Sequence, residues 1–170
     1  MHDMKPHNPT GMVFSKEQIQ SIVDVLSKPK NKDILVVSDE VYEDLVFEGA
    51  VHHHIATFNN GAMFDRTITV NSAAKKFSVT GWKIGFCIGP PELVQAINFV
   101  TRAENWCQAS AFQVAVARMF QYANTEPYEG YKNYWEWLPH MYSEKRDMVI
   151  QVCACACACV CLCVCSCAYV

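Results

Sequence analysis

The chain has 170 residues, enough for one domain with a hydrophobic core, and 51% of them are apolar while 18% are charged. This composition excludes an intrinsically disordered chain, and a net charge of -3 without a basic stripe argues against nucleic-acid binding. No cationic and apolar leader opens the sequence, so we expect no secretory signal. Eight of the ten cysteines lie between positions 153 and 167. The cysteine-poor remainder is typical of the cytoplasm or of the mitochondrial matrix.

The first feature is a turn at His7-Asn-Pro-Thr-Gly11, because Pro9 fixes its φ angle and Gly11 permits a tight bend. Such a turn would hold the Asn8 amide, which can donate and accept hydrogen bonds, in one place. An ordinary turn without a role is the alternative. The preceding residues give no room for the strand that would normally lead into such a turn, so we expect the sequence to begin within a fold.

A helix is predicted next. Ser15-Lys-Glu-Gln18 is a capping-box pattern, and it places the beginning of the helix directly after Ser15. Apolar residues follow at helical spacing, and Pro29 ends the element. The apolar set is Ile19, Ile22, Val23 and Leu26. We interpret this segment as a surface helix that packs on the core.

The apolar run from Ile34 to Val37 is typical of a parallel strand that is buried on both faces. It leads directly into acidic residues, and the carboxyl ends of parallel strands are where open α/β sheets bind ligands. If Val41 begins a helical turn, Asp39 and Tyr42 would point the same way. The alternative is a helix N-terminus at which the acids only favour the helix dipole.

Three adjacent histidines, His52-His-His54, occur in the loop-like segment from Glu43 to Asp65. Neighbouring histidines rarely converge on one ion, and no cysteine or acid stands at ligand spacing nearby. We therefore favour a solvated or packed loop and predict no metal site.

A second parallel strand is predicted at residues 67–70, and it delivers the polar stretch that begins at Asn71. A lysine at a strand end between apolar walls loses hydration of its ammonium form, so its pKa falls and the amine can act as a nucleophile. Lys75 is our candidate for this role. Ser72 and Lys83 could bind an anionic group of the same ligand. A loop with solvated lysines is the alternative.

The remaining elements are a third strand at residues 83–88 and three helices, at residues 91–100, 110–122 and about 127–148. Pro91 at the first helical position supports the first of these helices. Together the patterns predict an α/β fold of three layers, in which helices cover a mostly parallel sheet.

The segment from Gln151 to Val170 differs from the rest, because cysteine occupies every odd position from 153 to 167. Strict alternation suits a β-strand, nineteen mostly apolar residues could span a bilayer, and a thiol cluster could bind soft metals. We favour a fourth interpretation, a low-complexity tail of the kind that a translated dinucleotide repeat gives, outside the native fold.

The side chains at the predicted strand ends would together suit pyridoxal phosphate. The aldehyde of this cofactor needs a lysine, its pyridine nitrogen a carboxylate, its phenolic oxygen hydroxyl or amide donors, and its phosphate a hydroxyl and a cation. The residues concerned are Asn8, Asp39, Tyr42, Ser72, Lys75 and Lys83.

The motifs in this order resemble those of the fold-type I, class I aminotransferases, and within them the kynurenine aminotransferases, also called glutamine transaminase K or cysteine-S-conjugate β-lyase. The resemblance covers roughly residues 6–150. The matching motifs are Pro6-His-Asn-Pro-Thr-Gly11, Ser38-Asp-Glu-Val-Tyr-Glu43, His54-Ile-Ala-Thr-Phe58, Arg66-Thr-Ile-Thr-Val70 and Ser72-Ala-Ala-Lys-Lys-Phe-Ser-Val-Thr-Gly-Trp-Lys-Ile-Gly85.

By this resemblance Lys75 would bind the cofactor aldehyde covalently and then carry a proton at the substrate α-carbon. The implied reaction passes an amino group from an amino acid to a 2-oxo acid. Lys76 is the competing candidate, but Lys75 keeps the three-residue step from Ser72 and the six-residue step to Gly81. The resemblance assigns the other residues to the cofactor: Asp39 to the pyridine nitrogen, Asn8 and Tyr42 to the phenolic oxygen, Ser72 and Lys83 to the phosphate.

The chain is much shorter than members of the family that it resembles. We expect part of the cofactor-binding large domain at residues 1–125 and a helix at residues 126–150 that leads toward a largely absent small domain. The tail would follow at residues 151–170. The resemblance implies a homodimer, and we expect no association with a membrane. The alternative function is that of a truncated, non-catalytic isoform that keeps part of the dimer surface.

Overall fold

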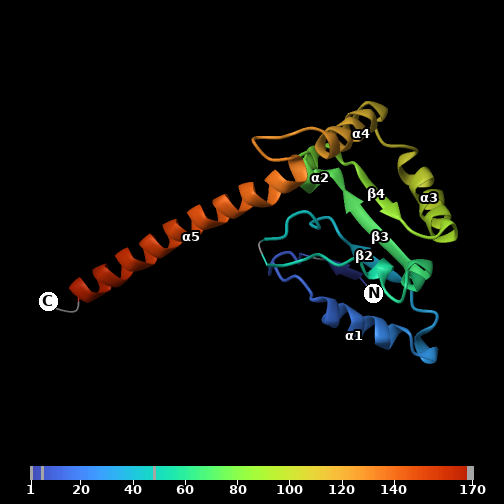
Figure 1. Ribbon diagram of the computed structural model, residues 1–170, viewed down its shortest axis with the longest axis horizontal. Helices are drawn as coiled ribbons and strands as arrows, with labels where there is room; N and C mark the ends of the chain where they lie inside the picture. The colour runs from blue at the N-terminus through green and yellow to red at the C-terminus, as the bar shows by residue number, and fades with distance from the viewer. Residues whose placement is uncertain (1, 5, 48, 168–170) are drawn as a thin grey trace.

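The computed structural model describes residues 2–4, 6–47 and 49–167, and the side chains of residues 6–47 and 49–154. One sheet contains four strands in the order β1 (His2–Met4), β2 (Val36–Asp39), β3 (Thr67–Ser72) and β4 (Gly85–Ile88). The helices are α1 (Lys16–Leu26), α2 (Ala73–Lys76), α3 (Pro91–Asn105), α4 (Ser110–Thr125) and α5 (Tyr134–Cys167). Figure 1 shows α1 on one side of the strands and α3 and α4 on the other. The α/β fold with helices around a mostly parallel sheet is confirmed.

Two strands differ from the sequence expectations. A strand does precede the first turn, because β1 pairs with β2 in parallel over three residues. The third predicted strand shortens to β4 and runs antiparallel to β3. Its direction has a physical cause, since α2 is a single turn and is too short to carry the chain back across the sheet for a parallel pairing.

Strand β2 begins two residues later than its apolar run predicts, at Val36, and Leu35 remains 51% exposed. The guanidinium group of Arg66 explains this shift. Its Nε donates to the Ile34 carbonyl at 2.9 Å, and its Nη1 donates to the Leu26 carbonyl at 3.0 Å. A side chain therefore satisfies the backbone just before the strand, and no ladder bond is needed there.

Helix α1 begins as its capping box predicts. The Ser15 hydroxyl accepts from the Gln18 amide at 3.3 Å, and the Gln18 side chain accepts from the Ser15 amide at 2.8 Å. The buried face of the helix joins a core cluster that also contains residues of β2 and of the segment before β3. Its members are Ile19, Val23, Leu26, Val36, Ile55, Phe58 and Met63. This cluster fixes α1 against the sheet.

A second cluster lies where α2 meets β4 and α4. Ala73, Ile84 and Val116 are buried at its centre. Trp82 stacks on Phe112 of α4, with ring centroids 4.9 Å apart and planes 11° from parallel. Aromatic packing thus holds the loop between α2 and β4, which carries the predicted phosphate-binding Lys83.

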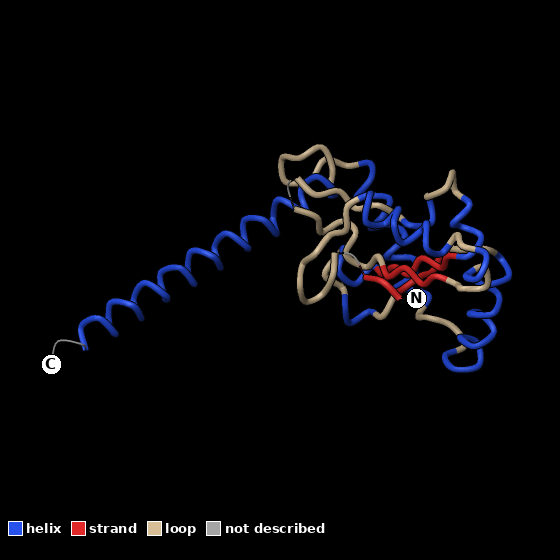
Figure 2. The backbone as a smooth tube through the Cα atoms, turned by 90° about the horizontal axis from the view of Figure 1, so that it is seen from below, coloured by secondary structure: helices blue, strands red, loops and turns tan. Residues whose placement is uncertain are grey.

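Helix α5 begins at Tyr134, later than the predicted start near Pro127. Glu129 and Gly130 have φ angles of 48° and 83°, which no right-handed helix accepts, so residues 128–131 form a turn instead. The helix then continues to Cys167 and extends away from the body of the molecule (Figures 1 and 2).

The cysteine-rich tail is helical up to Cys167, so the β-strand interpretation of its alternation is wrong. A single strand would have needed a neighbour for its backbone hydrogen bonds, whereas a helix satisfies them internally. The predicted boundary at residue 151 coincides with no break in α5. Among the described residues no helix is long and apolar enough to cross a membrane. The soft-metal interpretation depends on the cysteine side chains of the tail, and most of these lie outside the described side chains.

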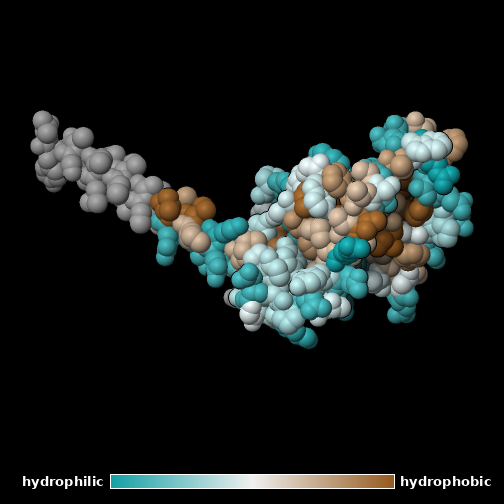
Figure 3. Space-filling view, turned by 90° about the horizontal axis from the view of Figure 1, so that it is seen from above, coloured by the Kyte–Doolittle hydropathy of each residue, from teal (hydrophilic) through white to brown (hydrophobic). Residues whose placement is uncertain are grey.

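Large apolar side chains are exposed on the body of the molecule and on the described part of α5 (Figure 3). The most exposed are Trp106 and Phe99, at 82% and 80%, both at or near the end of α3. Met148, Val149, Ile150 and Val152 form a second exposed group on α5. Patches of this kind commonly cover an interaction surface.

Candidate active site

The carboxyl ends of the parallel strands bring the predicted site residues to one edge of the sheet. Asp39, the last residue of β2, pairs in register with Val70 of β3 and with Met4 of β1. Asn8 follows β1 by four residues, and Ser72 is the last residue of β3. Ligand sites of open α/β sheets lie at this edge.

Three of the six predicted residues meet there. The Asn8 Nδ2 group donates a hydrogen bond to the Tyr42 hydroxyl oxygen at 3.3 Å, although 34 residues separate them. The Lys75 Nζ atom lies 5.9 Å from the centre of the Tyr42 ring. The predicted turn holds Asn8, since the Gly11 amide donates to the His7 carbonyl at 2.7 Å with Gly11 at a φ of 70°. A pocket of about 310 Å³ opens beside Asn8 and Tyr42.

Asp39 lies at the start of the turn that leads to Tyr42. Its Oδ1 atom accepts from the Val41 amide at 3.3 Å, which fixes the carboxylate at the strand end. Residues 41–44 form a turn rather than the helical turn considered from the sequence. The alignment of Asp39 with Tyr42 on a helix face therefore does not apply, although both remain at the same edge.

Ser72 and Lys83 lie at the adjoining end of the β3–β4 pair. Ser72 is the N-cap of α2, where its hydroxyl accepts from the Ala74 amide at 3.1 Å and donates to the Ile84 carbonyl at 2.9 Å. Lys83 is exposed in a left-handed conformation with a φ of 57°, two residues before Gly85, the register partner of Ser72. The two predicted phosphate ligands thus come from neighbouring backbone.

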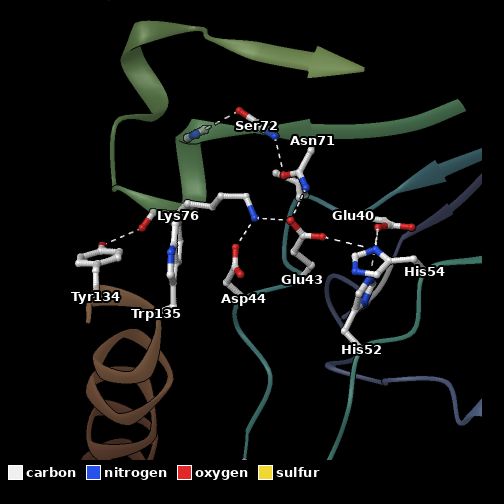
Figure 4. A network of polar contacts seen from close by, with 12 residues as sticks. Glu40, Glu43, Asp44, His52, His54, Asn71, Ser72, Lys76, Tyr134 and Trp135 are labelled. Atoms are coloured by element: carbon white, nitrogen blue, oxygen red, sulfur yellow. Dashed lines mark hydrogen bonds and ion pairs between the residues drawn. The ribbon is translucent and has the colours of Figure 1, made fainter. Parts of the chain in front are cut away.

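The adjacent lysines of α2 have different surroundings (Figure 4). Lys76 is only 3% exposed, and its Nζ atom lies 2.6 Å from Glu43 Oε1 and pairs also with the Asp44 carboxylate. These two ion pairs engage the Lys76 side chain with the turn after β2. Lys75 is half-buried and faces Tyr42 instead.

Sequence reasoning missed a cluster of acids and histidines beside these residues (Figure 4). Glu40 is 1% exposed, its Oε2 atom contacts His54 Nδ1, and it lies 3.3 Å from His52 Nε2. Glu40 and Glu43 lie nine or more residues before His52 along the chain, and the turn after β2 brings them to the histidines in space. The sequence feature that could have indicated this cluster is Glu40, a second acid directly after the buried strand.

The ion pair changes the pKa values of its members. Burial alone would raise the pKa of Glu40, but the contacts of its carboxylate with His52 and His54 outweigh burial and lower the pKa to about 2. The hydrogen bond with Glu40 in turn raises the pKa of His54. The pair therefore favours an ionised Glu40 and a protonated His54.

Residues 4–153 match the family described as aminotransferase class I and II. The chain belongs to this family. Among its relatives, a kynurenine–oxoglutarate transaminase of Dictyostelium discoideum is 42% identical over 145 residues, which are 85% of this chain and 31% of the relative. Human kynurenine–oxoglutarate transaminase 3 is 40% identical over 147 residues, 86% of this chain and 31% of the relative. The chain thus spans about a third of the length of the curated relatives it matches.

Solved aminotransferase structures share the fold. N-succinyldiaminopimelate aminotransferase of Mycobacterium tuberculosis superposes with a TM-score of 0.74 at 33% identity, over 90% of this chain and 36% of that chain. Bna3p of Saccharomyces cerevisiae, a putative kynurenine aminotransferase, gives a TM-score of 0.74 at 30% identity, over 86% of this chain and 32% of that chain. The chain is a partial aminotransferase domain, as its motifs predict.

Proposed function

We propose that this chain forms the lysine-bearing part of a pyridoxal-phosphate-dependent aminotransferase that transfers an amino group from an amino acid to a 2-oxo acid. One observation carries the proposal: Asn8, Tyr42 and Lys75, from three distant parts of the chain, converge at the carboxyl edge of the sheet. The ion pairs of Lys76 support Lys75 as the reactive lysine.

The residues at this edge fit the cofactor. When bound, pyridoxal phosphate supplies an aldehyde for amines and a ring that withdraws electrons from the substrate α-carbon. The donor set comprises an amine, a hydroxyl oriented by an amide, a carboxylate at a strand end and an exposed cation. In this order they are Lys75, Tyr42 with Asn8, Asp39, and Lys83.

Each residue would have a separate task. The Lys75 amine holds the aldehyde and afterwards moves a proton at the substrate α-carbon. Because Asn8 donates to the Tyr42 oxygen, the Tyr42 proton remains available for an anionic oxygen. Asp39 would keep a ring nitrogen protonated by pairing with its charge. Ser72 would have to redirect its proton from the Ile84 carbonyl to reach a phosphate oxygen.

The substrate proposal rests on the relatives. Several are named kynurenine–oxoglutarate transaminases, so we infer kynurenine as a donor and oxoglutarate as an acceptor. The motif resemblance adds glutamine and aromatic or sulfur-containing amino acids as further proposed donors. Since the chain spans about a third of these relatives, we assign cofactor binding to the chain itself. Turnover is assigned to a longer protein or a homodimer that contains it.

The test is reduction of the cofactor onto the protein. The purified chain is incubated with pyridoxal phosphate, its visible absorption is recorded, and borohydride reduction is followed by peptide mapping. We expect an absorption band that shifts with pH, and label on Lys75. Lys75→Ala should abolish both, whereas Lys76→Met should retain label on Lys75. Label on Lys76, or label scattered over surface lysines, would contradict the proposal.

A non-catalytic interaction module is the second candidate, and the exposed apolar side chains of α3 favour it. Such a module would associate with a full-length aminotransferase subunit and would give no cofactor band. Size-exclusion chromatography of the mixed proteins separates the two candidates when it is combined with the absorption spectrum.

A further inference from the structure

We propose that Glu40, Glu43, His52 and His54 form a site for a divalent metal ion of the zinc class, separate from the lysine site. Each residue offers one ligand atom, and these four atoms lie within 4.8 Å of one another (Figure 4). Two elements build the cluster, namely the turn after β2 and the loop that contains the three adjacent histidines.

The distances suit a small coordination sphere. Glu40 Oε2 lies 3.3 Å from His52 Nε2, and Glu43 Oε2 lies 3.6 Å from His54 Nδ1. In a tetrahedral site with metal–ligand bonds of about 2.1 Å, neighbouring ligand atoms are ~3.4 Å apart. An ion between these atoms would replace the direct contact of Glu40 with His54.

The state of His52 is an independent observation that points to a ligand. Its side chain is 8% exposed, and neither ring nitrogen has a hydrogen-bond partner. Within the described part of the chain, these two are the only buried side-chain nitrogen or oxygen atoms in that state. The Nε2 atom of His52 lies 3.3 Å from Glu40 Oε2 without forming a hydrogen bond. An imidazole buried in this way costs free energy, and coordination through Nε2 would recover part of it.

A second layer of contacts orients both carboxylates. The Ser38 hydroxyl donates to Glu40 Oε1 at 2.9 Å, which leaves Oε2 toward the histidines. The Asn71 amide and the Lys76 ammonium group donate to Glu43 Oε1, each at 2.6 Å, and again leave Oε2 toward His54. Partners of this kind fix the ligands of metal sites in proteins.

The ligand chemistry selects the class of ion. Two imidazoles favour zinc, cobalt or nickel over calcium and magnesium, which prefer oxygen ligands alone. Two carboxylates would neutralise the charge of a divalent ion, provided that both histidines bind in their neutral form.

The experiment uses the full chain with its thiols alkylated by iodoacetamide, because Cys87, Cys107, Cys153 and the cysteines of the tail would bind the same ions. After dialysis against EDTA and then chelator-free buffer, zinc chloride is titrated by calorimetry. We expect one zinc per chain.

His54→Ala tests the ligand set at its half-exposed member. We expect zinc affinity to fall at least about tenfold, which is the minimum seen for residues that support a metal site. The matched control is His53→Ala, which removes the neighbouring histidine outside the cluster and should bind zinc like the parent. Far-UV circular dichroism checks the fold of each protein.

Cobalt(II) absorption gives a second measurement on the alkylated chain. We expect visible bands of a four-coordinate ion that disappear in Glu40→Gln, without the near-ultraviolet charge-transfer bands that sulfur ligands would add. Three results would overturn the proposal: no stoichiometric zinc uptake by the parent, unchanged affinity in His54→Ala, or an equal loss in His53→Ala.

Discussion

At the scale of single residues, the sequence predicts side chains that follow a strand end directly. Tyr42 and Lys75 are of this kind, Asn8 was predicted from its turn alone, and the structure brings all three together. It does not predict the contacts of Glu40 with the histidines, since a non-helical turn and a loop must first fold onto each other. Nor does it predict that Ser72 uses its hydroxyl as a helix cap.

Removal of the Lys76 charge should destabilise the protein. In Lys76→Met, Glu43 and Asp44 would face each other at a partly buried site without a cation, so we expect a loss of about 1–3 kcal/mol in the free energy of unfolding. Urea denaturation measures this loss. Lys75→Met is the control, with a change within about 1 kcal/mol, and an equal loss in both variants would contradict the prediction.

The Glu40–His54 pair should make the stability of the metal-free protein depend on pH. The lowered pKa of Glu40 stabilises the fold above about pH 4.3, its unfolded value, and this contribution is lost as the pH falls toward about 2. The raised pKa of His54 stabilises the fold below about pH 6.5 and is lost as the pH rises through the folded value. The pair thus contributes most between these two limits.

Urea midpoints measured in EDTA across this pH range test the effect. His54→Gln should flatten the decrease on the alkaline side relative to the parent. Parallel pH profiles of the two proteins would show that the pair makes no net contribution to folding.

At the scale of elements, local signals predict well and long-range ones do not. The capping box of α1 depends on four consecutive residues, and its start is as predicted. The direction of β4 and the existence of β1 depend on pairing with distant strands. The end of α5 was missed because alternating cysteines carry no helical period, although the backbone is helical.

Loss of the α1 cap should be measurable. Ser15→Ala removes both hydrogen-bonding functions of the Ser15 hydroxyl at the N-terminus, and we expect a cost of about 1 kcal/mol in unfolding free energy. Ser21→Ala is the matched control, because Ser21 lies inside the same helix and its hydroxyl only bonds back to the Glu17 carbonyl. Thermal or urea unfolding that ranks the two variants in the opposite order would refute this account.

At the scale of the whole molecule, the chain is one part of a larger architecture, spanning 36% of a solved aminotransferase of the same fold. The motifs predicted a fragment of the family's length, and the share of each relative that the chain covers confirms this. Helix α3 and its C-terminal end carry large apolar side chains that are exposed in this chain.

Polar substitution of this surface should reduce self-association. Phe99→Ser and Trp106→Ser together remove the two most exposed aromatic side chains, and we expect less dimer or larger species at a given concentration. Light scattering coupled to size-exclusion chromatography measures the effect. The control is Val51→Ser, which changes a residue that is 64% exposed in a loop. Association that is equally weakened in the control would refute the assignment to α3.

The single turn of α2 has a consequence for changes in chain length. Successive side chains of a helix are about 100° apart, so Lys75 meets Tyr42 and Lys76 meets the acids only at one spacing from Ser72. Deletion of one residue between Ser72 and Lys75 would point Lys76 in the direction of Tyr42 and turn Lys75 in the direction that Ala74 now has. It would turn one lysine away from the site and deprive Glu43 and Asp44 of their cation, without altering the identity of either lysine. An insertion or deletion at this point should therefore impair folding and cofactor binding more than most substitutions would.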